Sequence, residues 1–271
     1  SIRKYDGKYY FVYSSRHNHE LCYAVSDSPT EGFVYKGTLI SNADIFPAKG
    51  MTEKDAKNYI GNNHGGMLRL KDQYYIFYHR QTNRNSYSRQ TCAEKLVCDE
   101  NGDFLQAEMT SCGLNNGPLK GEGVYEARIA CNLWSKVGAG RYDVGNPRKL
   151  LKEHPYITQD KKDGDATARQ YIANMRDGAV AGFKYFEITD PTEIGICLNG
   201  NGNGEMLVSN TADFKESVHI PISVSSQKWQ YFNTELPEIH GNAALYFKYE
   251  GEGSINFFQF ELKKAGEENE K

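Results

Sequence analysis

Short runs that alternate between apolar and polar residues fill the first hundred positions. Residues 2–15 (IRKYDGKYYFVYSS) and residues 67–80 (MLRLKDQYYIFYHR) share one pattern, 65 residues apart: a strand, a tight polar turn and a second strand rich in Tyr. Asp-Gly between two such runs is a strong hairpin signal, and Tyr, Phe and Val favour strands. The pattern therefore predicts a repeated antiparallel hairpin.

Each hairpin precedes a further pair of predicted strands, at 20–25 and 32–36 in the first repeat and at 89–96 and 102–105 in the second. Four short antiparallel strands that recur are typical of a β-propeller blade. The alternative is two unrelated hairpins that share common strand residues. A propeller has about four to eight blades. Because two blades do not close a ring, we expect further blades upstream.

Strand patterns resume near residue 171, after a turn-rich stretch at 115–121. No segment has helical periodicity. Regularly spaced strands with turns between them indicate a β-sandwich. The Asn/Gly run at 199–204 is interpreted as one of these turns, and the predicted strands are 183–188, 194–198, 218–222, 244–249 and 255–262.

Together these patterns predict an all-β chain. We expect the last blades of a propeller over 1–118, a β-sandwich of jelly-roll type over 119–264 and a charged tail over 265–271. A polar insertion at 41–63 lies between the two blades and runs into the sequence GNNHGG. Because loops on a rigid scaffold often carry function, this insertion is a candidate part of a site.

Composition narrows the function classes. The net charge is −3, so no basic footprint for nucleic acid is present. No apolar run reaches the roughly 20 residues of a membrane span. The first residues, SIRK, lack the apolar region of a signal peptide and begin inside a strand pattern, so we expect the natural protein to extend upstream. The six cysteines form no CxxC pair, which argues against a zinc cage and favours free thiols over a disulfide framework.

Several motifs in the first 112 residues resemble a known enzyme family. SIRK with its Tyr-rich hairpin, NNHG at 62–65, YHR at 78–80 and SRQT at 88–91 resemble, as an ordered set, the closing blades of glycoside hydrolase family 43. The resemblance implies a five-bladed propeller and a β-xylosidase or α-L-arabinofuranosidase activity with inversion.

The same resemblance implies where the catalytic groups lie. Inverting hydrolysis needs two carboxyl groups, one as acid and one as base. The family places an Asp base, a second Asp that tunes the acid and a Glu acid before the SIRK segment. We therefore assign no catalytic residue in this chain. Asp6, in a turn, and Glu20, at a strand start, are expected to be solvated.

Four residues of the blades are candidates for substrate binding. By the resemblance, His64 lies near the propeller axis and touches a bound Ca²⁺ or its water shell, and Arg89 points toward the sugar. Arg80 and Arg16 rank lower. A histidine alone makes a weak calcium site, because calcium prefers oxygen ligands. The alternatives are a loop histidine bonded to backbone and a surface arginine at a strand edge.

Residues 124–262 resemble a family 6 carbohydrate-binding module through DGAVAGFKYF at 177–186, Trp229 and NFFQF at 256–260. Sugar binding needs a flat aromatic face and amide donors, and the candidates are Trp229, Tyr171 and Asn256. The alternatives are a packing role for Trp229 and a purely structural sandwich. Ala and Val follow the Asp-Gly turn where the family often has an aromatic residue.

The sequence thus favours a glycoside hydrolase acting on xylan- or arabinan-type carbohydrate, with this chain as its C-terminal part. The alternatives are a non-catalytic carbohydrate-binding protein and a β-rich interaction protein. A separate chain that supplies the missing blades is a second possible partner, and polysaccharide substrates favour a secreted or periplasmic location. The sequence does not discriminate xylose from arabinose.

Overall fold

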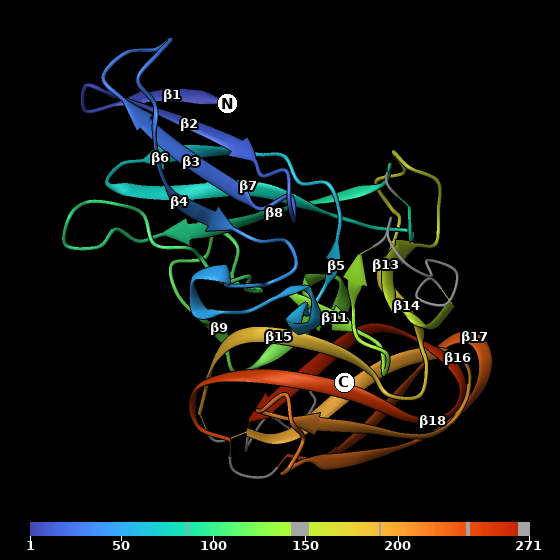
Figure 1. Ribbon diagram of the computed structural model, residues 1–271. Coiled ribbons are helices and arrows are strands. Elements are labelled where there is room, and N and C mark those ends of the chain that lie inside the picture. Colours follow the sequence, from blue (N-terminus) through green and yellow to red (C-terminus); the bar gives the residue numbers. More distant parts are fainter. Residues whose placement is uncertain (86, 142–151, 190, 237–238, 265–271) are drawn as a thin grey trace. The chain divides into compact units, whose positions relative to one another are not determined.

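The computed structural model describes residues 1–85, 87–141, 152–189, 191–236 and 239–264 (Figure 1). Over these residues the chain is all-β, as predicted, with three single-turn 3₁₀ helices: η1 (Pro47–Lys49), η2 (Glu53–Asp55) and η3 (Ala127–Ile129). No helix in the described ranges is long and apolar enough to cross a membrane.

Backbone contacts divide the chain into two compact units. The first comprises Ser1–Met109 and Gly138–Pro147, and the second comprises Thr110–Val137 and Arg148–Lys271, of which only the described residues are discussed. The predicted division after residue 118 stays a prediction.

The first sheet of the first unit has the four-strand meander expected of a blade. Its order is β1 (Ile2–Tyr5), β2 (Lys8–Ser14), β3 (Leu21–Ser26) and β4 (Val34–Ile40), all antiparallel. Asp6 and Gly7 both have positive φ, 48° and 84°. A two-residue hairpin turn with this backbone matches the twist of its strands, which confirms the Asp-Gly signal.

The second sheet repeats this arrangement less completely. It contains β6 (Gly66–Leu70), β7 (Gln73–Gln81) and β8 (Arg89–Leu96). Where a fourth strand was predicted at 102–105, the structure has a single bridge between Cys98 and Phe104. A short parallel pair, β5 (Tyr59–Ile60) with β12 (Gly140–Arg141), completes the unit.

Aromatic rings hold the two sheets of the first unit together. Phe104 contacts Tyr10 and Tyr23 of the first sheet, at centroid distances of 5.9 and 5.6 Å, and Tyr74 of the second at 5.0 Å. The buried Tyr23 hydroxyl accepts a hydrogen bond of 2.8 Å from the Phe104 amide. Edge-to-face aromatic pairs stabilise beyond their buried area, so this cluster ties the repeated hairpins into one core.

The second unit is built around one long strand. In β18, residues up to Tyr249 pair with β15 and residues from Ile255 onward pair with β14 and β10, while β16 pairs along nearly its whole length. The strands of this unit are β9 (Leu119–Lys120), β10 (Gly123–Glu126), β11 (Asn132–Trp134), β13 (Tyr156–Gln159), β14 (Gln170–Met175), β15 (Ala179–Ile188), β16 (Pro191–Ser209), β17 (Val218–Glu235) and β18 (Gly241–Lys264).

The long strands fold back to make a sandwich (Figure 1). Phe247 and Phe257 lie ten residues apart on β18. Ten residues of extended strand span roughly 33 Å, yet the ring centroids of the two residues are 5.2 Å apart. Phe183 of β15 likewise contacts Phe260, at 4.7 Å. The two halves of the ribbon therefore face each other across a core of buried aromatic rings, as the sandwich prediction required.

The interpretation of 199–204 as a turn is wrong. These residues lie inside β16, which runs unbroken from Pro191 to Ser209. Gly200 and Gly204 have φ of 121° and 157°, and a Cβ on Gly202 would lie 2.6 Å from Ile255. Glycine within a strand marks a bend or a close backbone approach. Here it marks the place where the ribbon folds over.

All six cysteines carry free thiols, in agreement with the sequence prediction. Cys22 and Cys131 are buried, whereas Cys98 is exposed. Burial raises the pKa of the Cys92 thiol. A buried thiol that stays protonated is inert, so Cys92 behaves as a small packing residue.

Candidate functional site

In the first unit, corresponding strands of the two repeated sheets begin at the same end. The Ser1 amino group donates to the carbonyl of Val12, at 2.7 Å, which places the start of β1 beside the end of β2. A Cβ on Gly66 would lie 2.9 Å from Ser1 Oγ, so β6 begins next to β1. The turn after β2, the 61–65 loop and the turn after β7 therefore gather at one end of this unit.

Two histidines stack at this end. The rings of His64 and His79 have centroids 5.7 Å apart and an interplanar angle of 20°. Nδ1 of His79 lies 3.3 Å from the amide nitrogen of His64 and 3.2 Å from its carbonyl oxygen, so the tautomer decides which bond forms. His64 itself is exposed. The backbone of His64 is therefore held by His79, while the residue itself stays exposed.

Two buried asparagines support this histidine pair. Asn63 Oδ1 accepts from the His79 amide at 3.3 Å, and Asn42 Nδ2 donates to the His79 carbonyl at 3.4 Å. Asn63 Nδ2, Asn42 Oδ1 and His79 Nε2 are buried without a hydrogen-bond partner among the described residues. Buried polar groups are normally paired, so these atoms could bind water or a polar ligand. The sequence reasoning singled out neither asparagine, although Asn63 lies in the NNHG motif at 62–65.

The strand register separates the two arginines that the sequence proposed together. Arg89 pairs with Gln81 across β7 and β8 and shares the face of His79, whereas Arg80 pairs with Gln90 on the opposite face. Arg80 is buried and donates through Nε to Gln90 Oε1 at 2.9 Å. Burial, and then the charge of Arg89, lower the pKa of His79. Arg89 therefore lies on the same face of the sheet as His79 and close enough to affect its pKa, whereas Arg80 lies on the other face.

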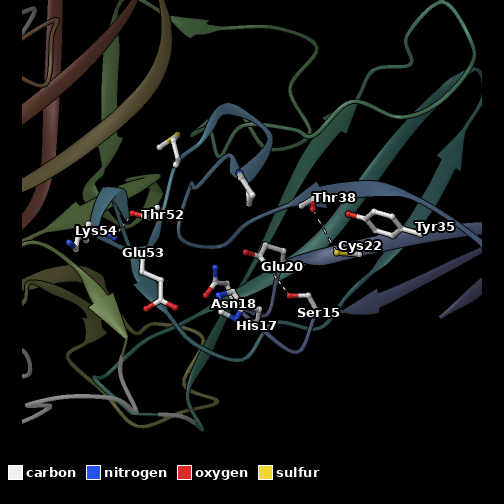
Figure 2. Close-up of a pocket in the computed structure, with 12 residues that line it drawn as sticks. Ser15, His17, Asn18, Glu20, Cys22, Tyr35, Thr38, Thr52, Glu53 and Lys54 are labelled. Carbon is white, nitrogen blue, oxygen red and sulfur yellow. Dashed lines mark hydrogen bonds between the residues drawn. The ribbon is translucent and has the colours of Figure 1, made fainter.

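A pocket of about 720 Å³ opens beside the turn after β2 (Figure 2). The turn that holds Arg16 contributes four neighbours to its lining, but Arg16 itself is exposed and is not among the lining residues. The lining comprises Ser15, His17, Asn18, Glu20, Cys22, Tyr35, Thr38, Pro47, Met51, Thr52, Glu53 and Lys54.

The expectation that Glu20 is solvated is wrong. Glu20 is 5% exposed, and its carboxylate accepts a hydrogen bond from the hydroxyl of Ser15 (Figure 2). A buried carboxylate needs such a donor because desolvation is costly. Nothing in the local sequence marks this residue as buried.

The residues present do not by themselves fit a calcium ion. Across the described ranges, no group of three or more His, Cys, Asp or Glu side chains is arranged to hold a metal. Calcium takes about six to eight oxygen ligands, and His64 would supply one nitrogen.

The second unit brings its three predicted sugar-binding residues to one outer face. Trp229 of β17 contacts Tyr171 of β14 edge to face, at 5.3 Å and 70°, and stacks on Phe258 of β18 at 5.0 Å and 30°. The three aromatic side chains, Trp229, Tyr171 and Phe258, are half-buried. Because the Tyr171 and Trp229 rings touch, a sugar does not fit between them, and the cluster offers one aromatic platform. Phe258 was not singled out from the sequence.

Asn256 borders this platform through a chain of amides. Its Nδ2 donates to Asn199 Oδ1 at 2.8 Å, and Asn199 Nδ2 donates to the carbonyl of Gln227 at 2.9 Å. This chain fixes the orientation of the Asn256 side chain. Sugar-binding sites combine an apolar face with a few oriented polar groups, and the outer face of β14, β16, β17 and β18 has both.

Comparison with known proteins places this geometry in context. No protein family model matches the chain. Over 262 residues, 97% of its length, the chain is 42% identical to a protein named "Xylosidase/arabinosidase" from Thermoclostridium stercorarium. The chain is homologous to that protein. It spans 55% of the length of this relative, so it corresponds to about half of it.

Two solved structures are similar to this chain, one over nearly its whole length and one over about half of it. One is a glycoside hydrolase family 43 arabinoxylan arabinofuranohydrolase from Bacillus subtilis, at 19% identity and a TM-score of 0.49, over 97% of this chain and 53% of that chain. The other is a family 6 carbohydrate-binding module from Clostridium cellulolyticum, at 13% identity and 0.38, over 54% of this chain and 99% of that chain. Because both TM-scores are below 0.5, the fold is assigned from the strand pairing of this chain and not from these two structures.

Proposed function

We propose that this chain is the C-terminal part of an inverting glycosidase of the family 43 type, which removes xylose or arabinose from plant-type polysaccharide or its oligosaccharides. The observation that carries the proposal is the 42% identity with a xylosidase/arabinosidase over 97% of the chain. The repeated blade-like sheets and the polar end of the first unit agree with it.

In this proposal the first unit supplies binding groups rather than the catalytic carboxyls. His64, His79 and Arg89 form a cluster of donors and acceptors at one end of the blades. A guanidinium gives directed donors to sugar hydroxyls, and its positive charge favours the ionised form of a nearby carboxyl. The base, its partner Asp and the acid would come from the preceding part of the protein.

An assay on small glycosides tests the proposal. The chain and the full-length protein from its native start are compared on p-nitrophenyl β-xyloside and p-nitrophenyl α-L-arabinofuranoside. We expect hydrolysis by the full-length protein, with inversion seen by NMR, and none by the chain alone. A full-length protein inactive on both glycosides would contradict the proposal.

A non-catalytic carbohydrate-binding protein is the second candidate. The Trp229 platform favours it, because sugar binding there needs no catalytic carboxyl. Affinity electrophoresis of the chain in gels with arabinoxylan tests this role. Trp229→Ala should weaken the retention, and Trp134→Ala, which replaces the other tryptophan, is the control. We also propose that the protein is secreted or periplasmic. We further propose that the complete propeller binds calcium, with His64 among the ligands.

A further inference from the structure

The 720 Å³ pocket has a buried polar floor. Glu20 and Asn18, which are 5% and 7% exposed, come from the turn between β2 and β3. Ser15 donates to Oε2 of Glu20, and the other carboxylate oxygen has no hydrogen bond to the described residues. A carboxylate oxygen that has no donor is a strong acceptor for a hydroxyl group.

A β-bulge places an aromatic ring on the rim. In β4, Gly37 pairs with Tyr23 while Tyr35 pairs with Ala24, so Lys36 is an extra residue. Bulges re-aim side chains and are common beside functional sites. This one puts Tyr35 and Thr38 on the same face, where both line the pocket. Tyr35 is 59% exposed and offers a flat apolar surface.

The opposite wall is held in place by a capping box at η2. Thr52 Oγ1 accepts from the Lys54 amide at 3.4 Å, and Asp55 accepts from the Thr52 amide at 2.7 Å. Thr52, Glu53 and Lys54 of this turn all line the pocket (Figure 2). A capping box satisfies the amides at the start of a helical turn, so the wall is formed before any ligand arrives.

The charges of the lining select among ligands. The carboxylate of Glu20 places a negative charge in the floor of the pocket, where the Ser15 hydroxyl donates to it. Carboxylates accept hydrogen bonds from hydroxyls, whereas an anionic ligand would meet like charge. One aromatic face, several acceptors and a volume typical of small-molecule sites fit a neutral polyhydroxylated ligand.

We propose that this pocket is a second carbohydrate site, separate from the histidine pair, which binds a neutral xylo-oligosaccharide segment and rejects one that carries a uronic acid. This inference rests on the proposed function for its substrate class. The turn at 15–20 lies at the same end of the unit as Ser1.

Calorimetric titration of the 271-residue chain tests the site directly. Trp229→Ala is introduced throughout, so that the sandwich platform does not contribute. We expect xylotetraose to bind, Tyr35→Ala to weaken it roughly three- to tenfold, and Val34→Ala, which changes the opposite face of β4, to leave it unchanged. Absence of xylotetraose binding in the Trp229→Ala chain would overturn the proposal, as would equal effects of the two β4 substitutions.

Charge selection has its own readout. Xylotetraose that carries a glucuronosyl branch should bind more weakly than xylotetraose, and Glu20→Gln should narrow that difference. An unchanged difference would refute the role of the Glu20 charge. Neither titration depends on hydrolysis, so an inactive full-length protein would refute the proposed function and leave this site standing. In an active full-length protein, Tyr35→Ala should raise the KM for arabinoxylan relative to that for the small glycoside.

Discussion

Replacing Gly65 by alanine should destabilise the first unit and shift His64. A Cβ at this position would lie 1.8 Å from the carbonyl oxygen of Phe77 and 2.9 Å from a methyl group of Leu21. A carbon-oxygen contact needs about 3.3 Å, so the 61–65 loop or β7 must move by roughly 1.5 Å. Phe77 belongs to the central strand of its sheet and cannot rotate its carbonyl away.

Overpacking of this kind costs about 1–3 kcal/mol, which lowers the Tm by roughly 3 °C or more for a unit of this size. Differential scanning calorimetry of the chain measures it. Gly66→Ala is the matched control, because its Cβ would meet only the side chain of Ser1, which can move. Equal transition temperatures for the two variants would refute the reasoning, and so would an unaltered His64 ring signal by NMR in Gly65→Ala.

Four further predictions concern His79, calcium and the aromatic platform. Arg89→Gln should raise the pKa of His79, seen by NMR titration, because a lowering charge is removed; no change would contradict their proximity. Since the folded pKa of His79 is below the unfolded value of about 6.5, its contribution to stability is complete above that value and is lost as the pH falls; chemical unfolding at several pH values, compared with His79→Gln, measures this. Millimolar CaCl₂ should leave the Tm of the chain as it is in EDTA, and a rise would show a calcium site that the described residues do not reveal. Trp229→Ala should weaken arabinoxylan retention about two- to tenfold, and unchanged retention would contradict a role of the aromatic platform in sugar binding.

The hairpins were predictable because their signals are local. Asp6-Gly7 specifies its own turn, and the alternation around it specifies the strands. The site was only partly predictable. His64 and Arg89 were found through motifs, and the structure brings them to the same end of the unit. Arg80 lies on the other face because register decides faces, and a single sequence does not show the register of β7 with β8.

The sequence by itself determined the all-β class, the repeat and the aromatic residues that fill both cores, since side-chain alternation and turn chemistry act over a few residues. Tertiary structure decided the rest. It buried the carboxylate of Glu20 and folded β18 so that Phe247 meets Phe257. It also made the Asn/Gly run at 199–204 a bend within a strand. Burial and close approach depend on what packs against a residue, and that neighbour is distant in the chain.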